Sequence, residues 1–122
     1  LKNMIANSIR ELTKSKDNPE YDNIIVSGLY VEFFSKNVTT ESDDFITKFL
    51  VNGKDLNENS NYSISTNNYV VSQLKKYFGE LPEEIKSEDT NILDRDLIIE
   101  ALQKEKEINP VFEKRIVDKD KE

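Results

Sequence analysis

Apolar residues recur every three or four positions in the first fifteen residues of the chain. They are Leu1, Met4, Ile5, Ile9 and Leu12. This spacing gathers them on one face of an α-helix, so we predict an amphipathic helix at residues 1–15. Polar residues and then Pro19 follow. A proline biases the residue before it away from helical angles, so the helix should end before it.

Short apolar stretches further along predict β-strands. We place them at 23–27, 29–34, 44–51 and 62–66. Gly28 separates the first two, and a glycine inside a strand pattern often marks a bulge or a close backbone approach. The Asn52-Gly53 pair favours the positive φ angles of a two-residue hairpin turn. The third stretch should therefore be the first strand of a hairpin.

Helical patterns return in the second half of the chain. A short helix is expected at 69–78, with Gly79 where a C-terminal cap glycine would lie. A longer helix should begin at a cap formed by Thr90 or Asn91 and run to about residue 106. Its apolar face comprises Leu93, Leu97, Ile98, Ala101 and Leu102.

An extended segment and a charged tail complete the chain. Residues 111–117 should be extended. All five residues of the tail at 118–122 are charged, so we expect the tail to be frayed. The order of elements predicts an α/β (α+β) domain, with a mixed, largely antiparallel sheet and helices packed on it. The domain should cover residues 1–117, followed by the tail at 118–122.

Charge and length narrow the classes of partner. A chain of 122 residues is one domain or part of one. It carries 24 acidic and 17 basic residues, a net charge of −7. Phosphate backbones and anionic membranes attract clustered Lys and Arg, so nucleic acid and membrane surfaces are not the expected partners. No apolar run approaches the roughly 20 residues of a membrane helix.

The chain contains neither cysteine nor histidine. It therefore offers no disulfide, no thiolate nucleophile and no Ser-His-Asp triad, and it lacks the commonest ligands of zinc. It begins at Leu1, without a Met and inside a predicted helix. We expect it to be a fragment of a longer protein.

The stretch at 61–78, NYSISTNNYVVSQLKKYF, resembles the C-terminal domain of the 5'-nucleotidases. In that family a strand ending Tyr-x-Val-x-Thr-Asn-Asp leads to an aromatic, a Gly-Gly-Asp-Gly turn and a second aromatic that stacks on the nucleobase. The matching residues here are Tyr62, Thr66, Asn67, Asn68, Tyr69 and, at the stacking position, Tyr77. The sequence departs from the family at Gln73, Leu74, Lys75 and Lys76, which replace the glycine-rich turn.

Further blocks of the chain extend the resemblance. They are LKNMIANSI at 1–9, IIVSGLYVEF at 24–33, the hairpin VNGKDLNENSNYSISTNN at 51–68, and INPVFEKRI at 108–116, which is similar to the family ending. The resemblance implies a substrate-binding domain, joined in the same protein to an N-terminal metallophosphoesterase domain. That missing domain would carry a dinuclear site of divalent metals, so this chain would hold only the second half of the C-terminal domain.

The resemblance also nominates residues for a nucleotide or nucleoside substrate. Tyr77 would stack on the base, although an aromatic at a helix end can equally pack beneath the helix. Asn67 and Asn68 would either bond the ligand or cap the helix, and we favour the cap. Glu83 falls where the family has a ribose-binding carboxylate, but a solvated acid is the simpler interpretation. The family implies an extracellular, cell-surface or periplasmic location.

Two other charged features have structural interpretations. Asp94 and Asp96 start the last helix but face different directions, so they should complement the helix dipole rather than share a proton or a metal. Arg115 matches the terminal arginine of the family, and we expect it to form a structural salt bridge.

Three hypotheses about function follow. The first is a substrate-binding domain of a 5'-nucleotidase-like hydrolase of phosphoric monoesters, not catalytic by itself. The alternative is a non-catalytic binding or interaction module that keeps the fold but has lost the nucleobase pocket. The third is an acidic α/β domain unrelated to that family.

Overall fold

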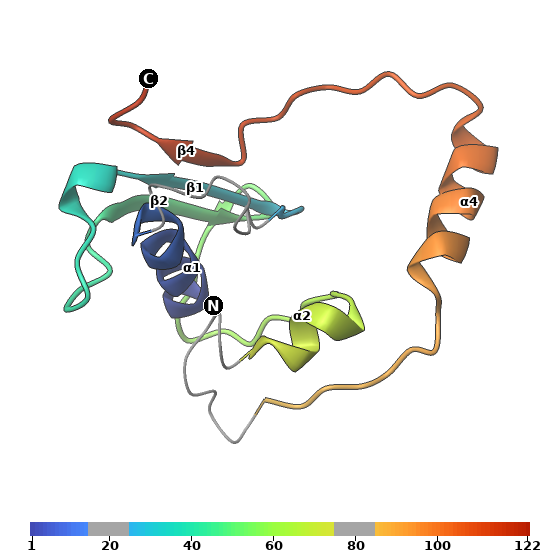
Figure 1. Cartoon of the computed structure of the whole chain (residues 1–122), viewed down its shortest axis with the longest axis horizontal. Helices are drawn as coiled ribbons and strands as arrows, with labels where there is room; N and C mark the ends of the chain where they lie inside the picture. The colour runs from blue at the N-terminus through green and yellow to red at the C-terminus, as the bar shows by residue number, and fades with distance from the viewer. Residues whose placement is uncertain (15–24, 75–84) are drawn as a thin grey trace.

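The computed structural model describes residues 1–14, 25–74 and 85–122 of the chain. The elements in these residues are α1 (Lys2–Lys14), β1 (Leu29–Phe33), a 3-10 helix (Ser35–Asn37), β2 (Ile46–Val51), β3 (Lys54–Asp55), α2 (Asn68–Ser72), α4 (Asp94–Glu105) and β4 (Ile116–Asp118). None of the helices described is long and apolar enough to cross a membrane. Figure 1 shows a small sheet with α1 beneath it and a long loop of chain carrying α4 beside it.

The sheet has four strands in the order β3-β2-β1-β4. β2 pairs antiparallel with both β1 and β3, while β4 joins the other edge parallel to β1. The expected mixed α/β architecture, with a largely antiparallel sheet, is therefore confirmed. Because β1 and β4 run in the same direction, the chain must cross from one end of the sheet to the other between them, and residues 34–115 make this connection.

A two-residue turn joins β2 to β3, as predicted. Asn52 and Gly53 both have positive φ angles, 49° and 77°, as a type I′ turn requires. The Asn52 amide donates to the carbonyl of Gly28 at 2.7 Å. Gly28 itself has φ 74°, and a Cβ there would lie 2.8 Å from Asn52 Oδ1. The glycine is thus needed both for its backbone angle and for this close approach.

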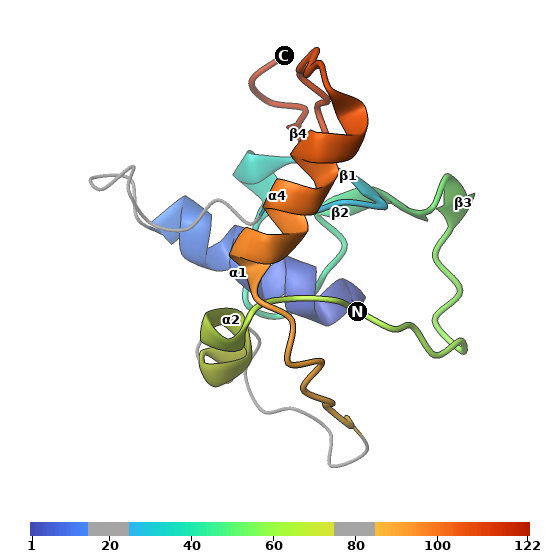
Figure 2. The same cartoon turned by 90° about the vertical axis from the view of Figure 1, so that its right-hand side faces the viewer.

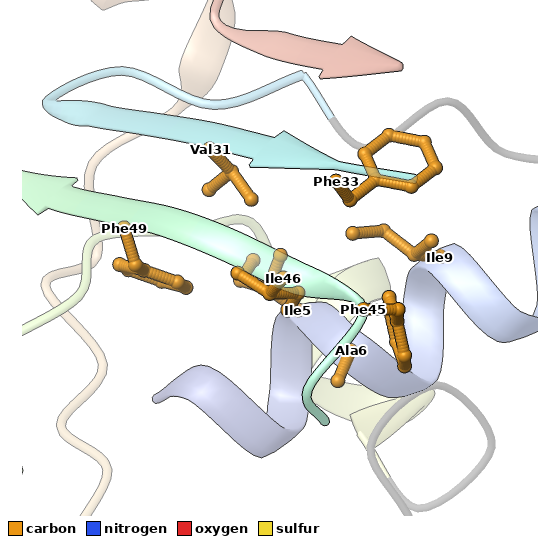
Figure 3. Packing of buried hydrophobic residues seen from close by; sticks show 8 residues of the cluster. All are labelled: Ile5, Ala6, Ile9, Val31, Phe33, Phe45, Ile46 and Phe49. Atoms are coloured by element: carbon orange, nitrogen blue, oxygen red, sulfur yellow. The ribbon is translucent and has the colours of Figure 1, made fainter. Parts of the chain in front are cut away.

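One face of the sheet packs on α1 and forms the core (Figure 3). Its buried residues are Ile5, Ala6 and Ile9 from α1, Val31 and Phe33 from β1, and Phe45, Ile46 and Phe49 at β2. The predicted helical stripe supplies the α1 side of this core, because residues four apart lie one above the other on a helix. The prediction of an N-terminal amphipathic helix is confirmed.

Arg10 is the charged residue that this packing buries, with 8% of its surface exposed. Its guanidinium donates to the carbonyls of Thr39 and Ser42, at 2.5 and 2.8 Å, and to Asp43 Oδ1 at 2.5 Å. It also donates to Asn7 Oδ1 at 2.7 Å. One arginine of α1 therefore holds the loop between β1 and β2.

The segment 118–122 is not frayed, so that prediction is wrong. The Lys119 amide donates to the carbonyl of Phe33 at 2.8 Å. Asp118 Oδ1 accepts from the Ser35 amide at 3.1 Å, and Asp120 Oδ2 accepts from the Lys36 amide at 2.8 Å. The carboxylates thus satisfy backbone donors at the start of the 3-10 helix, as N-cap side chains do.

These contacts alter the acidity of Asp118. Burial alone would raise the pKa of this carboxyl group. The hydrogen bonds from the side chain and backbone of Ser35, the Asp120 amide and the positive charge of Lys121 outweigh burial and hold its pKa below the usual value of 3.8. Asp118 is therefore anionic at neutral pH and binds the 3-10 helix in that form.

Two predicted strands are absent from the described residues. Residues 62–66 form no strand, and neither do residues 25–27, the described part of the stretch predicted at 23–27. The Tyr62 hydroxyl instead bonds both backbone groups of Asn57, at 2.9 and 3.2 Å. These contacts of Tyr62 lie within the segment that follows β3, and residues 62–66 take part in no described strand pairing.

The last helix begins later than predicted and does not pack on the sheet. Its N-cap is Leu93, without a side-chain hydrogen bond, so the predicted cap at Thr90 or Asn91 is wrong. Figure 1 shows α4 standing apart from the sheet and α1, and Figure 2 views the molecule from the side of α4. Every residue from 85 to 114 is exposed. We call residues 85–114 the arm, and residues 1–14, 25–56 and 115–122 the sheet unit.

Candidate functional site

The asparagines at the start of α2 act first as helix-capping residues. Asn67 has extended angles, φ −91° and ψ 165°, and its Oδ1 accepts from the Val70 amide at 2.9 Å. Its carbonyl accepts from the Val71 amide at 3.1 Å. The prediction of a cap is confirmed for Asn67, and its side-chain oxygen is already occupied by that bond.

Asn68 and Tyr69 form the exposed surface beside this cap. Asn68 is the first residue of α2, and 62% of the surface of Tyr69 is exposed. The structure therefore places Asn67, Asn68 and Tyr69 at one accessible corner of the chain. Tyr77 and Glu83, the other two candidates, lie outside the described residues.

The end of α2 corresponds to the position of the glycine-rich turn in the family pattern with which the sequence was compared. Gln73 has φ −100° and ψ 6°, an angle pair open to any residue. Its amide donates to the carbonyls of Tyr69 and Val70, both at 3.1 Å. The backbone therefore continues the helical turn through Gln73 and does not take the positive φ that favours glycine.

A shallow hollow of about 300 Å³ lies between the start of α1 and the segment after β3. Its lining residues are Leu1, Lys2, Asn3, Asp43, Leu56, Asn57, Glu58, Ser60 and Tyr62. Lys2 Nζ lies 3.9 Å from Glu58 Oε1 across this hollow. Its volume is at the lower limit for small-ligand sites, and its charged groups are partly paired with each other.

A second open hollow, of about 340 Å³, lies where β1 begins. It is lined by residues 27–30, by Asn52 and Gly53, and by residues 113–115. Arg115 Nε donates to Glu113 Oε2 at 2.7 Å, and Nη1 donates to the carbonyl of Val26 at 2.6 Å. The predicted salt bridge of Arg115 is confirmed, so its charge serves the fold at this place.

Tyr30 lines the same hollow and is held on the sheet surface. Its hydroxyl donates to Glu32 Oε1 at 2.6 Å, and Lys48 Nζ lies 5.5 Å from the centre of its ring. The hydrogen bond to Glu32 is the main reason that the pKa of Tyr30 is raised above 10.0. Sequence patterns did not single out this hollow, although Gly28, Asn52 and Arg115 lie in the blocks that carry the resemblance.

The acidic residues of the described part of the chain do not gather into one group. No group of three or more carboxylates in them is placed to hold a metal ion. Asp96 pairs with Arg95 at 3.1 Å, and both Asp94 and Asp96 lie in the first turn of α4. The amides, hydroxyls and aromatic ring at the start of α2 suit recognition of a polar ligand.

Comparison of the chain with models of protein families, with curated proteins and with solved structures gave no match.

Proposed function

We propose that this chain is the substrate-binding part of a 5'-nucleotidase-like metallophosphoesterase that acts on nucleotides. In this proposal the chain binds the nucleoside. A second domain of the same protein holds two divalent metal ions and hydrolyses the phosphoric monoester. The family resemblance also suggests an extracellular, cell-surface or periplasmic protein.

One observation supports the proposal most strongly. Segments that carry the resemblance are far apart in the sequence, and they contact each other at one end of the sheet. The Asn52 amide bonds the Gly28 carbonyl at 2.7 Å, and Arg115 bonds the Val26 carbonyl at 2.6 Å. Three of the blocks, at 24–33, 51–68 and 108–116, are joined by these two bonds. The blocks supply neighbouring strands of one sheet, and the proposal rests on their order along the chain together with these contacts.

In this proposal, the ring of Tyr77 stacks on the nucleobase and the side chain of Asn68 makes polar contacts with the ligand. Asn68 is exposed beside the Asn67 cap. An aromatic side chain that stacks on a base contributes about 1–3 kcal/mol to binding. Loss of the ring should therefore weaken binding by about 5- to 150-fold, since 1.4 kcal/mol corresponds to a tenfold change in Kd.

Titration of adenosine into the full chain, followed by calorimetry, tests this assignment. Tyr77→Ala should weaken binding by that factor, and Tyr77→Phe, which keeps the ring, should retain most of the affinity. Tyr30→Phe is the matched control, because Tyr30 lies on the sheet away from α2. Equal affinity of the chain and Tyr77→Ala would remove Tyr77 from the site.

The proposal also expects no hydrolysis by this chain alone. A nucleoside monophosphate incubated with the chain and Mn²⁺ or Zn²⁺ should release phosphate no faster than the metal ion does without protein. Turnover above that background would contradict the assignment of catalysis to another domain.

A second candidate is a binding or interaction module that has lost the nucleobase pocket. The conformation of Gln73, helical where the family turn has glycine, favours it. Under this alternative, adenosine fails to bind the unaltered chain at millimolar concentration. The same titration therefore separates the two candidates.

A further inference from the structure

We propose that Asn52 is the residue at which this chain deamidates spontaneously, and that opening of the turn between β2 and β3 controls the reaction. The inference rests on the surroundings of the Asn52-Gly53 pair and on the backbone angles of its turn. It goes beyond the proposed function, because it involves no nucleotide and no second domain.

Deamidation of an asparagine needs only the amide nitrogen of the following residue and water. That nitrogen loses its proton and forms a bond to the side-chain Cγ, and ammonia leaves as the Cγ–Nδ2 bond breaks. Water then opens the cyclic imide at one of its carbonyls. Opening at Cγ gives aspartate, whereas opening at the main-chain carbonyl gives isoaspartate, in which the backbone runs through Cβ and Cγ. A following glycine favours the reaction, because it has no side chain to obstruct the attack.

Asn52 and Gly53 form the one Asn-Gly pair of the chain, since the other glycines follow Ser27 and Phe78. Both residues of the pair are exposed, and a Cβ built at Gly53 would meet no atom within 4 Å apart from its neighbours in the chain. Within the described residues, neither the Asn52 side chain nor the Gly53 amide has a hydrogen-bond partner. The reacting groups and water can therefore meet here whenever the backbone angles allow it.

Two other exposed asparagines, Asn59 and Asn67, lack one of these conditions. Ser60 follows Asn59, and its amide donates to the carbonyl of Asn57 at 3.1 Å, so the attacking nitrogen is held. The side-chain oxygen of Asn67 accepts from the Val70 amide at 2.9 Å, which holds the side chain as a helix cap. Neither site offers a free side chain together with a free nitrogen.

The closed turn opposes the reaction at Asn52. Ring closure requires the Gly53 nitrogen to lie on the same side of the Cα–C bond of Asn52 as its Cβ. The first central residue of a type I′ turn has ψ of about +30°, which places the next nitrogen almost opposite Cβ. Asn52 occupies that position with φ 49°, and its amide donates to the Gly28 carbonyl at 2.7 Å. The nitrogen therefore reaches Cγ only after the turn opens.

Few contacts hold this turn closed. β3 has two residues, both exposed, and lies at the edge of the sheet. Beyond it, the Leu56 amide donates to the Phe49 carbonyl at 3.0 Å, and the half-buried Leu56 side chain packs against the core. Short exposed elements open locally at a lower free-energy cost than the core does. Asn52 is therefore released by local opening, without unfolding of the whole sheet unit.

Conversion changes the end of the sheet in two ways. Both products place a carboxylate at position 52, which lines the same hollow as Gly28 and Arg115. Isoaspartate also lengthens the backbone of a two-residue turn, so β2 and β3 can no longer keep their register. Opening of the hairpin is thereby followed by an irreversible change of charge and pairing at this site.

Incubation of the full chain in heavy-oxygen water tests the proposal, because the imide takes up a solvent oxygen when it opens. The chain is kept in mildly alkaline buffer, either folded or in urea, and its peptides are analysed by mass spectrometry. In the folded chain, Asn52 should gain the label faster than any other asparagine. In urea, its rate should rise at least about tenfold. Equal rates in the two conditions would contradict control by the turn.

Three variants separate the chemistry from the opening of the turn. Leu56→Ala weakens the attachment of β3 and should speed labelling of Asn52 in the folded chain at least about threefold. Asp55→Ala, at the neighbouring exposed position, should change that rate less than about 1.5-fold. Gly53→Ala obstructs the attack, so in urea, where no turn remains, it should slow labelling at least about tenfold.

The proposal has three outcomes that would overturn it. The first is no label at Asn52 in either the folded chain or Leu56→Ala. The second is faster labelling at another asparagine of the folded chain, and the third is an unchanged rate for Gly53→Ala in urea.

Discussion

The sheet unit and the arm have similar shares of apolar residues in the sequence but opposite fates in the structure. In the sheet unit, the stripe of α1 meets two strands and is buried, with Ile9 only 1% exposed. In the arm, the apolar residues of α4 are gathered less sharply on one face of the helix, and Leu97 and Ile98 remain 50% and 59% exposed. An apolar face on a helix is buried only where neighbouring elements cover it.

Stability should follow the same division. The sheet unit contains the buried apolar residues, so it should dominate the free energy of unfolding. The arm contributes exposed helix and extended chain, which gain little from burial. Matched variants in the two regions test whether their contributions to the free energy of unfolding differ in this way.

The largest effect is expected from a matched pair of apolar truncations. Ile9→Ala removes a buried side chain from the core between α1 and the sheet, and should lower the free energy of unfolding by about 2–4 kcal/mol. Leu97→Ala removes a half-exposed side chain from α4 and should change it by less than about 0.5 kcal/mol.

Urea unfolding followed by circular dichroism measures both variants. Equal losses for the two variants would show that α4 is packed after all, and the contrast between the regions would fail.

The second effect concerns charges within the sheet unit. Arg10→Ala removes four hydrogen bonds and leaves the Asp43 carboxylate without its guanidinium partner. Hydrogen bonds to charged groups contribute about 1.5–3 kcal/mol when buried, so we expect a loss of about 2–3 kcal/mol. Arg10 also lies 5.1 Å from the centre of the Phe45 ring, and that contact is lost too.

Lys14→Ala is the control on the same helix. Lys14 pairs with Glu11 at 2.8 Å, but both side chains are about 60% exposed. Exposed pairs contribute little, so this variant should change stability by less than about 0.5 kcal/mol. Thermal unfolding of the two variants compares the buried hydrogen bonds of Arg10 with an ordinary surface ion pair. Similar losses of stability would argue that Arg10 does not hold the loop between β1 and β2.

Sequence patterns predicted much of the sheet unit and little of what surrounds it. The α1 stripe, the strands around β1 and β2 and the Asn52-Gly53 turn were all predicted, because local spacing and backbone angles determine them. Arg10 was not singled out, although it lies four residues after Ala6 on the buried face of α1. Its partners at residues 39–43 are brought to it only by the tertiary fold.

Of the candidate site, the sequence predicted only the contacts between residues that are close together in the chain. The Asn67 cap follows from chemistry within three residues. The strand predicted at 62–66 does not form, because alternation of residues does not determine whether a segment pairs with a sheet; here the Tyr62 hydroxyl bonds the Asn57 backbone instead. The tail was predicted to fray on account of its charge, yet Asp118 and Asp120 cap backbone amides that lie more than eighty positions away in the sequence.

The smallest effect that we expect is a pH dependence in the attachment of β4 to the sheet. It should be confined to a few backbone amides. Because the folded pKa of Asp118 is lowered, the folded chain holds fewer protons than the unfolded chain near pH 3.8. The stability from this carboxylate is fully present above that pH and is lost as the pH falls through the folded pKa. The Ser35 and Lys119 amides should therefore lose hydrogen-exchange protection on acidification below pH 3.8, before the core amides of Val31 and Phe49 do.

Asp118→Asn keeps an oxygen acceptor but not the charge, so it removes the titration of Asp118 and leaves that of Asp120, whose pKa is lowered by its hydrogen bond from the Lys36 amide. Protection at Ser35 should be weaker than in the unaltered chain at pH 6 and should change less between pH 5 and pH 3. Asp94→Asn, at an exposed carboxylate in the first turn of α4, should leave the exchange profile of β4 unaltered. If protection at Ser35 survives to pH 2 in the unaltered chain, the parallel pairing of β4 with β1 holds the segment without the carboxylate.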